Sequence, residues 1–296
     1  MMRLPALIGA LLVCSLAAAA PTRTVRDDTS AEVRVPVDNC RLVSLAPGTT
    51  AMLFAAGAGR CLIGTIAHSK EPDEAASIPV VGDAETLDFE RLLAMRPTTV
   101  VVATDVVQRV RIDRIRELGI PVYEVHVTSL GQMPEAVRRL GALAATEAEA
   151  ERSSRVLAAE LARIAARYRD RPRVRVLYQI WDRPIYTIGG RHVINDALNV
   201  CGASNVFADL TTAAPAVTRE AAVLRDPDLI LVSAPPAPAE EWRAEWQKFP
   251  TLSAVRAGHV LPYTDERMDR MGPSVIEATA SLCKLIDQTR NPPTLR

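Results

Sequence analysis

One local pattern occurs twice in the chain, about 130 residues apart, and it constrains the fold more than any other feature. Glu90 and Glu220 each fall in the first turn of a short expected helix, with Asp88 and Thr218 before them as candidate helix caps. A proline follows each glutamate by seven residues, and a run typical of a buried strand comes next. The helix dipole favours a carboxylate at such a position by about 0.3–1 kcal/mol, which explains each glutamate alone but not the repetition. The repeat predicts two similar lobes, each presenting one acidic helix start.

Strand and helix patterns alternate through most of the 296 residues, as in parallel sheets with helices on both faces. From Thr146 to Arg169 there is no glycine or proline, and apolar residues recur at helical spacing. We expect one helix of about 24 residues there, between the two repeats. The predicted fold class is therefore α/β, with two Rossmann-like lobes that contain parallel sheets and are joined by one long rigid helix.

The individual elements follow from the same patterns. We expect strands at residues 41–45, 62–66, 100–103, 122–127, 174–180, 229–232 and 260–262, helices at 49–56, 89–95, 108–118, 133–143, 192–200, 241–248 and 274–289, and a proline-rich loop at 235–238.

The N-terminus has the pattern of a cleaved secretory signal. A basic Arg3 precedes the apolar run Leu4–Leu16, and small residues follow up to Ala20. The next residues are polar and interrupted by prolines, which predicts a flexible arm. The expected organisation is a signal peptide at 1–20, the arm at 21–39, an N-terminal lobe at 40–145, a linker helix at 146–170 and a C-terminal lobe at 171–296.

Composition and motifs exclude several classes of function. The chain has 35 basic and 35 acidic residues and no basic block, so nothing indicates a nucleic-acid partner. It has no nucleophile elbow, phosphate loop, His-Glu-x-x-His motif or acidic calcium loop. The four histidines are scattered, whereas metal ligands come in groups of three or four, so we expect no metal site.

Cysteine usage favours disulfides. Removal of the signal leaves Cys40, Cys61, Cys201 and Cys283, an even number in an exported chain. The sequence allows three pairings. Because one pair falls in each half of the chain, we expect Cys40–Cys61 and Cys201–Cys283.

Candidate ligand contacts follow strand ends, where open α/β sheets bind their ligands. Trp181 and Tyr186 flank a turn, and amphipathic aromatics are common in pockets. The full set of candidates is Pro47, Gly48, Thr49, His68, Trp181, Tyr186, Gly189, Ala214, Glu266, Arg267 and Arg270.

Several segments together resemble a known family. They are residues 41–47 with Thr50, residues 87–91, 118–122, 188–190, 200–207 and 215–220, and Leu282 with Cys283. From about Arg41 to Gln288 the chain resembles the helical-backbone type of periplasmic substrate-binding protein, which serves ABC importers of cobalamin, haem and iron siderophores. It is most similar to the cobalamin-binding members.

The resemblance implies a periplasmic protein, expected to be a monomer, that binds a small metal chelate between its lobes and performs no chemical step. Cobalamin or a related corrinoid is the expected ligand, and haem or a ferric siderophore is the alternative. Glu90 and Glu220 would form salt bridges with arginines on the two subunits of the permease dimer, and Cys201 and Cys283 match a disulfide of the family.

This sequence also departs from the family pattern. Several aromatic ligand contacts of the cobalamin-binding members fall on non-aromatic residues here, among them His68, Ala214 and Arg267. A secreted α/β hydrolase is the alternative of another class, but it needs a nucleophile–base pair that the sequence does not show.

Overall fold

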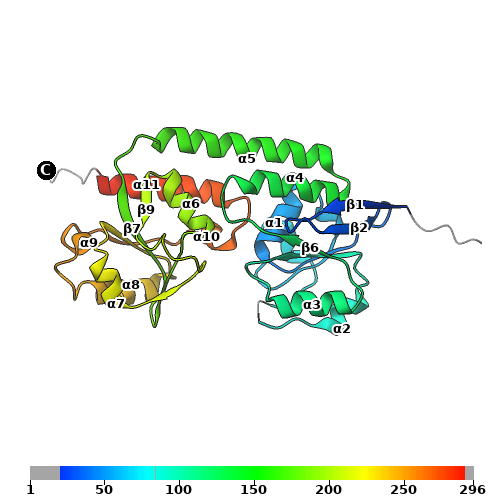
Figure 1. Cartoon of the computed structure of the whole chain (residues 1–296), viewed down its shortest axis with the longest axis horizontal. Helices are drawn as coiled ribbons and strands as arrows, with labels where there is room; N and C mark the ends of the chain where they lie inside the picture. The colour runs from blue at the N-terminus through cyan, green and yellow to red at the C-terminus, as the bar shows by residue number, and fades with distance from the viewer. Residues whose placement is uncertain (1–20, 84, 291–296) are drawn as a thin grey trace, which may run out of the picture.

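The computed structural model describes residues 21–83 and 85–290, so the predicted signal peptide lies outside the described residues. Figure 1 shows two lobes side by side, with the long helix α5 (Glu147–Tyr168) running across both. Among the described residues, no helix combines the length and the apolar character that a membrane crossing requires. The arrangement confirms the predicted fold class of two α/β lobes joined by one long helix.

The N-terminal lobe contains a parallel sheet of four strands in the order β4-β3-β5-β6. One face packs against α1 and α4 and the other against α2 and α3, which is why β5 is buried along its whole length. The elements of this lobe are β3 (Leu42–Ser44), α1 (Pro47–Ala55), η1 (Gly59–Cys61), β4 (Leu62–Gly64), η2 (Asp73–Ser77), α2 (Phe89–Ala94), β5 (Thr99–Ala103), α3 (Arg109–Glu117), β6 (Val122–Val125) and α4 (Gln132–Ala144).

The C-terminal lobe has a six-stranded sheet whose core, β9-β7-β11-β12, is parallel. It departs from the expected parallel pattern at one edge. There β8 runs antiparallel to β7, because the short turn between them can join only antiparallel neighbours, and β10 runs antiparallel to β8. The elements are β7 (Val174–Trp181), β8 (Ile185–Thr187), α6 (Val193–Val200), β9 (Ala203–Asn205), β10 (Ala216–Val217), α7 (Arg219–Leu224), β11 (Leu229–Val232), α8 (Pro236–Trp246), α9 (Ser253–Arg256), β12 (Val260–Pro262), α10 (Glu266–Arg270) and α11 (Val275–Arg290).

The prediction of a flexible arm at residues 21–39 is wrong. Residues 22–36 form an antiparallel hairpin of β1 (Thr22–Arg26) and β2 (Glu32–Pro36). Val33 and Val35 alternate with polar residues, and both are buried in the core of the N-terminal lobe. A two-stranded hairpin is marginal alone, so its packing on the lobe is what makes it stable.

A second difference concerns residues 235–238, which the prolines led us to assign to a loop. The helix α8 begins at Pro236. Proline is tolerated in the first turn of a helix, because the missing N–H has no intrahelical partner there in any case.

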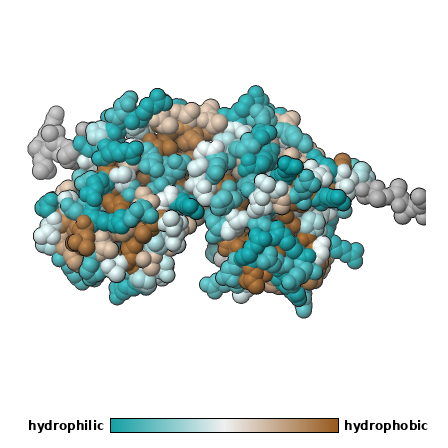
Figure 2. Space-filling view, viewed as in Figure 1, coloured by the Kyte–Doolittle hydropathy of each residue, from teal (hydrophilic) through white to brown (hydrophobic). Residues whose placement is uncertain are grey.

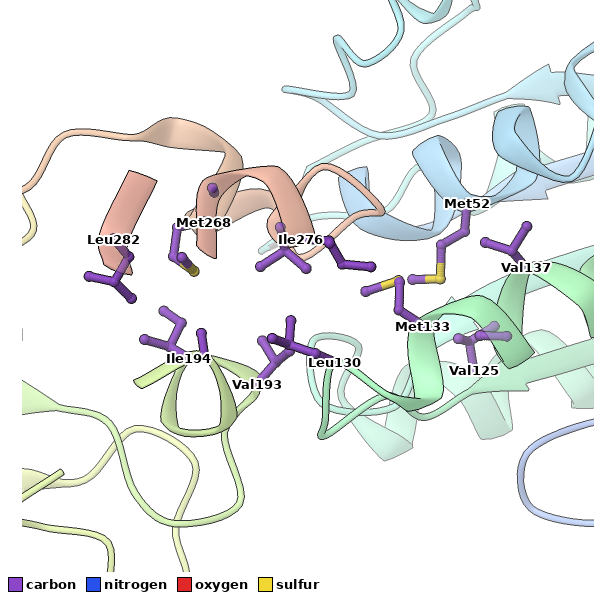
Figure 3. Close-up of a cluster of buried hydrophobic side chains, with 14 of the residues drawn as sticks. Met52, Val125, Leu130, Met133, Val137, Val193, Ile194, Met268, Ile276 and Leu282 are labelled. Carbon is purple, nitrogen blue, oxygen red and sulfur yellow. The ribbon is translucent and has the colours of Figure 1, made fainter. Parts of the chain in front are cut away.

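The two lobes share one apolar core beneath α5. Figure 3 shows Met52, Leu130 and Met133 from the N-terminal lobe in the same buried cluster as Ile194 and Ile276 from the C-terminal lobe. Opening the lobes widely would expose this cluster to water, which is unfavourable in proportion to the apolar area exposed. The packing therefore favours small relative motions of the lobes.

Polar contacts across the junction act in the same direction. The backbone N–H of Leu130 donates to Asp196 at 2.8 Å, and the Ser274 hydroxyl donates to Glu71 at 2.9 Å. Glu71 also lies 3.7 Å from the Arg270 guanidinium. Each contact joins one lobe to the other.

Both expected disulfides form. Cys40–Cys61 joins the segment just before β3 to the last residue of η1, with the Cα atoms 5.1 Å apart. Cys201–Cys283 joins the end of α6 to α11, with the Cα atoms 4.7 Å apart.

Candidate functional site

The two repeated units fold alike. Asp88 accepts a hydrogen bond from the backbone N–H of Arg91 at 2.8 Å and caps α2, and Thr218 accepts one from that of Ala221 at 3.1 Å and caps α7. The glutamates that follow the caps are exposed in both helices. Figure 1 places α2 and α7 on the side of the molecule away from α5, one on each lobe.

An arginine clamps the end of each repeated helix, a feature that sequence reasoning missed. Arg41 donates to the carbonyl oxygens of Met95 at 2.7 Å and Arg96 at 3.2 Å. In the other lobe Arg175 donates to the carbonyl oxygen of Asp226 at 3.0 Å. These carbonyls lack partners within the helix, so the cation both completes their hydrogen bonds and complements the helix dipole. The sequence signal that could have revealed these contacts is an arginine at the start of β3 and another at the start of β7.

A hollow of about 150 Å³ lies between the lobes, at the carboxyl ends of β3 and β5. Its walls come from the start of α1, the loop after β5 and the end of α10, so both lobes contribute. Four of the predicted contacts lie here, namely Pro47, Gly48, Thr49 and Arg270.

Gly48 lies where the lobes approach each other closely. A Cβ atom at this position would lie 2.6 Å from the carbonyl oxygen of Arg270, a distance that no side chain permits. Thr49 is fully buried, and its hydroxyl donates to the carbonyl of Ala46 at 2.9 Å, so its polar group serves the local fold. Gly48 and Thr49 therefore shape the wall of the hollow and do not supply hydrogen-bonding side chains to it.

Two carboxyl groups line the same hollow, Asp105 from the N-terminal lobe and Asp269 from the C-terminal lobe. Desolvation by the surrounding protein raises the pKa of both. The negative charge of Glu266 adds to the rise at Asp269, and a hydrogen bond with Ser233 opposes it. Sequence reasoning did not select either residue as a ligand contact.

A second hollow, of about 500 Å³, lies at the carboxyl ends of β7 and β11 in the C-terminal lobe. Trp181 is 57% exposed and packs edge-to-face against Trp242, with ring centroids 6.0 Å apart. Sequence reasoning found Trp181 but missed Trp242, because the latter belongs to α8 and reaches the site only through the fold. Ser233 lines this hollow and bonds to Asp269 of the first, so the two are neighbouring parts of the cleft. Figure 2 shows the groove between the lobes.

The tryptophan wall connects to α7 through a buried carboxylate. Asp182 follows Trp181, is 5% exposed, and accepts from Arg219 at 2.8 Å and from Arg183 at 3.0 Å. Because Arg219 is the first residue of α7, the ion pair fixes that helix relative to the cleft.

Other predicted contacts lie elsewhere. His68 is exposed in the loop after β4 and lines neither hollow, and the same holds for Tyr186 on β8 and Ala214 before β10. Gly189 is buried, and a Cβ atom there would lie 2.0 Å from the carbonyl oxygen of Thr212. This close backbone approach explains why the position is a glycine, and Gly189 lines neither hollow.

The charged residues of α10 divide between two sides. Arg267 pairs with Asp265 at 2.7 Å and with Glu277 at 3.2 Å, and Glu266 pairs with Arg270 at 2.5 Å. Glu266 and Arg267 line an open, polar hollow beside α11 and not the cleft; Arg270 borders both. Among the described residues there is no group of three or more histidine, cysteine, aspartate or glutamate side chains placed to hold a metal ion.

Two sheet-based lobes, a groove between their strand ends and a rigid connecting helix define a two-lobed ligand-binding protein. The chain belongs to the periplasmic binding protein family, whose model matches residues 42–266.

Similar proteins agree with this assignment. The chain is 26% identical over 250 residues to the vitamin B12-binding protein of Vibrio parahaemolyticus serotype O3:K6, covering 84% of this chain and 90% of the relative. It is 28% identical over 248 residues to the vitamin B12-binding protein of Salmonella choleraesuis, with the same coverage of 84% and 90%.

Solved structures share the fold. The periplasmic vitamin B12 binding protein BtuF of Vibrio cholerae superposes with a TM-score of 0.77 at 24% identity, over 85% of this chain and 98% of that one. The periplasmic heme-binding protein RhuT of Roseiflexus sp. RS-1 superposes with a TM-score of 0.72 at 21% identity, over 84% and 98%.

Proposed function

We propose that this chain is exported through a cleaved signal peptide at residues 1–20, binds cobalamin or a related corrinoid as a periplasmic monomer, and delivers it to an ABC importer without a chemical step. The observation that carries the proposal is the groove, walled by both lobes and lined by apolar and aromatic side chains. The relatives named vitamin B12-binding proteins support the choice of ligand.

The chemistry of the walls suits a large ligand with a flat apolar surface and an anionic group. The pair Trp181–Trp242 offers aromatic area that a ring system can cover. Arg183 lines the same hollow and Arg270 the neighbouring one. Such guanidinium groups pair with phosphate or carboxylate.

Calorimetric titration of the purified protein with cyanocobalamin, haemin and a ferric siderophore tests the ligand. We expect cyanocobalamin to bind tightly and the double variant Trp181→Ala, Trp242→Ala to bind at least tenfold more weakly. Tyr186→Ala is the matched aromatic change outside both hollows and should bind as the wild type does. Tight binding of haemin but not of cyanocobalamin would show that haem is the ligand. If none of the three compounds binds, the proposal that the ligand is a metal chelate is refuted.

Delivery would use Glu90 and Glu220, which we propose form salt bridges with arginines on the two permease subunits. Both residues are exposed, and Figure 1 shows that their helices, α2 and α7, lie on the same side of the molecule, one on each lobe. Exposed ion pairs contribute about 0–1 kcal/mol each and are screened by salt, so docking should weaken as ionic strength rises.

Charge reversal tests this role. We expect Glu90→Arg with Glu220→Arg to abolish uptake of the ligand by cells while the purified variant binds the ligand normally. Glu151→Arg makes the same charge change on an exposed residue of α5 and should leave uptake unchanged. Normal uptake by the double variant would show that these residues do not dock the protein.

A further inference from the structure

Two leucines are conspicuously exposed, and both lie on the repeated helices. Leu93 on α2 is 42% exposed and Leu224 on α7 is 86% exposed. In the described part of the chain no other leucine is as exposed as either. Single exposed apolar residues are ordinary on protein surfaces, but their occurrence on the two matched helices, one in each lobe, is a coincidence that needs a reason.

The leucines share a helix face with the glutamates. Leu93 follows Glu90 by three residues, and Leu224 follows Glu220 by four. Residues three and four apart are neighbours on a helix surface. Each lobe therefore presents a carboxylate and an isobutyl group side by side.

The orientation of each helix is fixed by its own packing. Leu92 and Ala222 are completely buried in the cores of their lobes, which sets the rotation of α2 and α7 about their axes. Arg41 and Arg175 hold the carboxyl ends of the same two helices. The exposed leucines are thus presented on anchored elements.

We propose that Leu93 and Leu224 are the apolar anchors of the docking surface, each seated in an apolar pocket of one permease subunit, beside the cation that pairs with the neighbouring glutamate. The inference rests on the docking function proposed above. Exposed ion pairs alone contribute little, whereas stable interfaces combine an apolar centre with a polar rim. The occupant is a two-fold symmetric partner because each lobe presents one carboxylate–leucine pair on its repeated helix, at a spacing of three residues in α2 and four in α7.

The inference predicts how salt acts on docking. The carboxylates supply the salt-sensitive part of the affinity and the leucines supply a part that salt does not screen. Removing the leucines should weaken docking at every salt concentration and leave its salt dependence unchanged, whereas removing the glutamates should flatten that dependence.

The experiment measures binding of the chain to the cognate ABC importer in nanodiscs at low and high salt, with cyanocobalamin affinity measured in parallel. We expect Leu93→Ala with Leu224→Ala to dock at least tenfold more weakly, with wild-type cyanocobalamin affinity and melting temperature. Val156→Ala on α5 removes apolar surface of similar exposure, 69%, and should dock as the wild type does.

The outcomes separate the inference from the function on which it rests. If the leucine variant docks like the wild type while Glu90→Arg with Glu220→Arg does not dock, the leucine inference is overturned and the docking helices stand. If both variants dock normally, the docking surface lies elsewhere and both proposals fail.

Discussion

Lowering the pH should destabilise the C-terminal lobe through His192. Its Nδ1 atom accepts a hydrogen bond from the backbone N–H of Ile194 at 3.1 Å and so caps α6. Burial lowers the pKa of His192 from 6.5 to about 4. A protonated imidazole has no free acceptor, so protonation would also remove the cap.

The sign follows from comparing the native and unfolded states. Well above pH 6.5 the imidazole is neutral in both states, and His192 adds no pH dependence. Between pH 6.5 and pH 4 the imidazole of His192 is protonated in the unfolded chain but stays neutral in the native protein. The free energy of unfolding therefore falls as the pH falls. The loss reaches about 3 kcal/mol below pH 4, and between pH 7.5 and pH 5.5 it amounts to about 1.3 kcal/mol.

Urea denaturation followed by circular dichroism at pH 7.5, 6.5 and 5.5 measures the effect. The variant His192→Asn keeps a good capping side chain without a titrating group, so its stability should fall by about 1.3 kcal/mol less than that of the wild type over this range. His68→Asn, a change at an exposed histidine, should behave as the wild type does. Equal losses in the wild type and His192→Asn would refute the reasoning.

Two further predictions concern stability. Replacing both cysteines of the Cys201–Cys283 pair by alanine should lower the free energy of unfolding by about 4 kcal/mol, and the same change at Cys40–Cys61 should lower it by about 3 kcal/mol. The first disulfide should contribute more because it closes a loop of 82 residues, whereas the second closes one of 21. Chemical denaturation curves with the opposite order of stability would contradict the loop-length argument. Trp246→Phe removes the indole N–H that donates at 2.7 Å to a buried glutamine amide oxygen and should cost about 1–3 kcal/mol, so a variant as stable as the wild type in urea would show that the bond contributes nothing.

Much of the frame was predictable because its signals are local. The glutamate–proline units at 90–97 and 220–227 predicted two matched helices, and the absence of glycine and proline from 146 to 169 predicted α5. These patterns need only the neighbours along the chain to be read, since helix caps and breakers act within one or two turns.

The cleft was predicted less well. The residues at the start of α1 were found because they follow a strand end, but Trp242 was missed and the close backbone approach at Gly189 was not foreseen. Trp242 has the sequence context of an ordinary surface helix, and its place beside Trp181 depends on how α8 packs across the ends of β7 and β11. Gly189 has to be a glycine because the carbonyl oxygen of Thr212, 23 residues further along the chain, packs against it.

The hairpin at 22–36 had a local signal, the alternation of Val33 and Val35 with polar residues, but a strand pair of this size becomes stable only when a lobe buries it. By itself, the sequence determined most of the parallel strands and the helices between them, the repeated capped helices and the long connecting helix. Only the tertiary structure decided which side chains face the groove, which backbone groups the two arginines clamp, and which leucines remain in water. Those outcomes depend on contacts between residues far apart in the chain, and such contacts leave no periodic trace in the sequence.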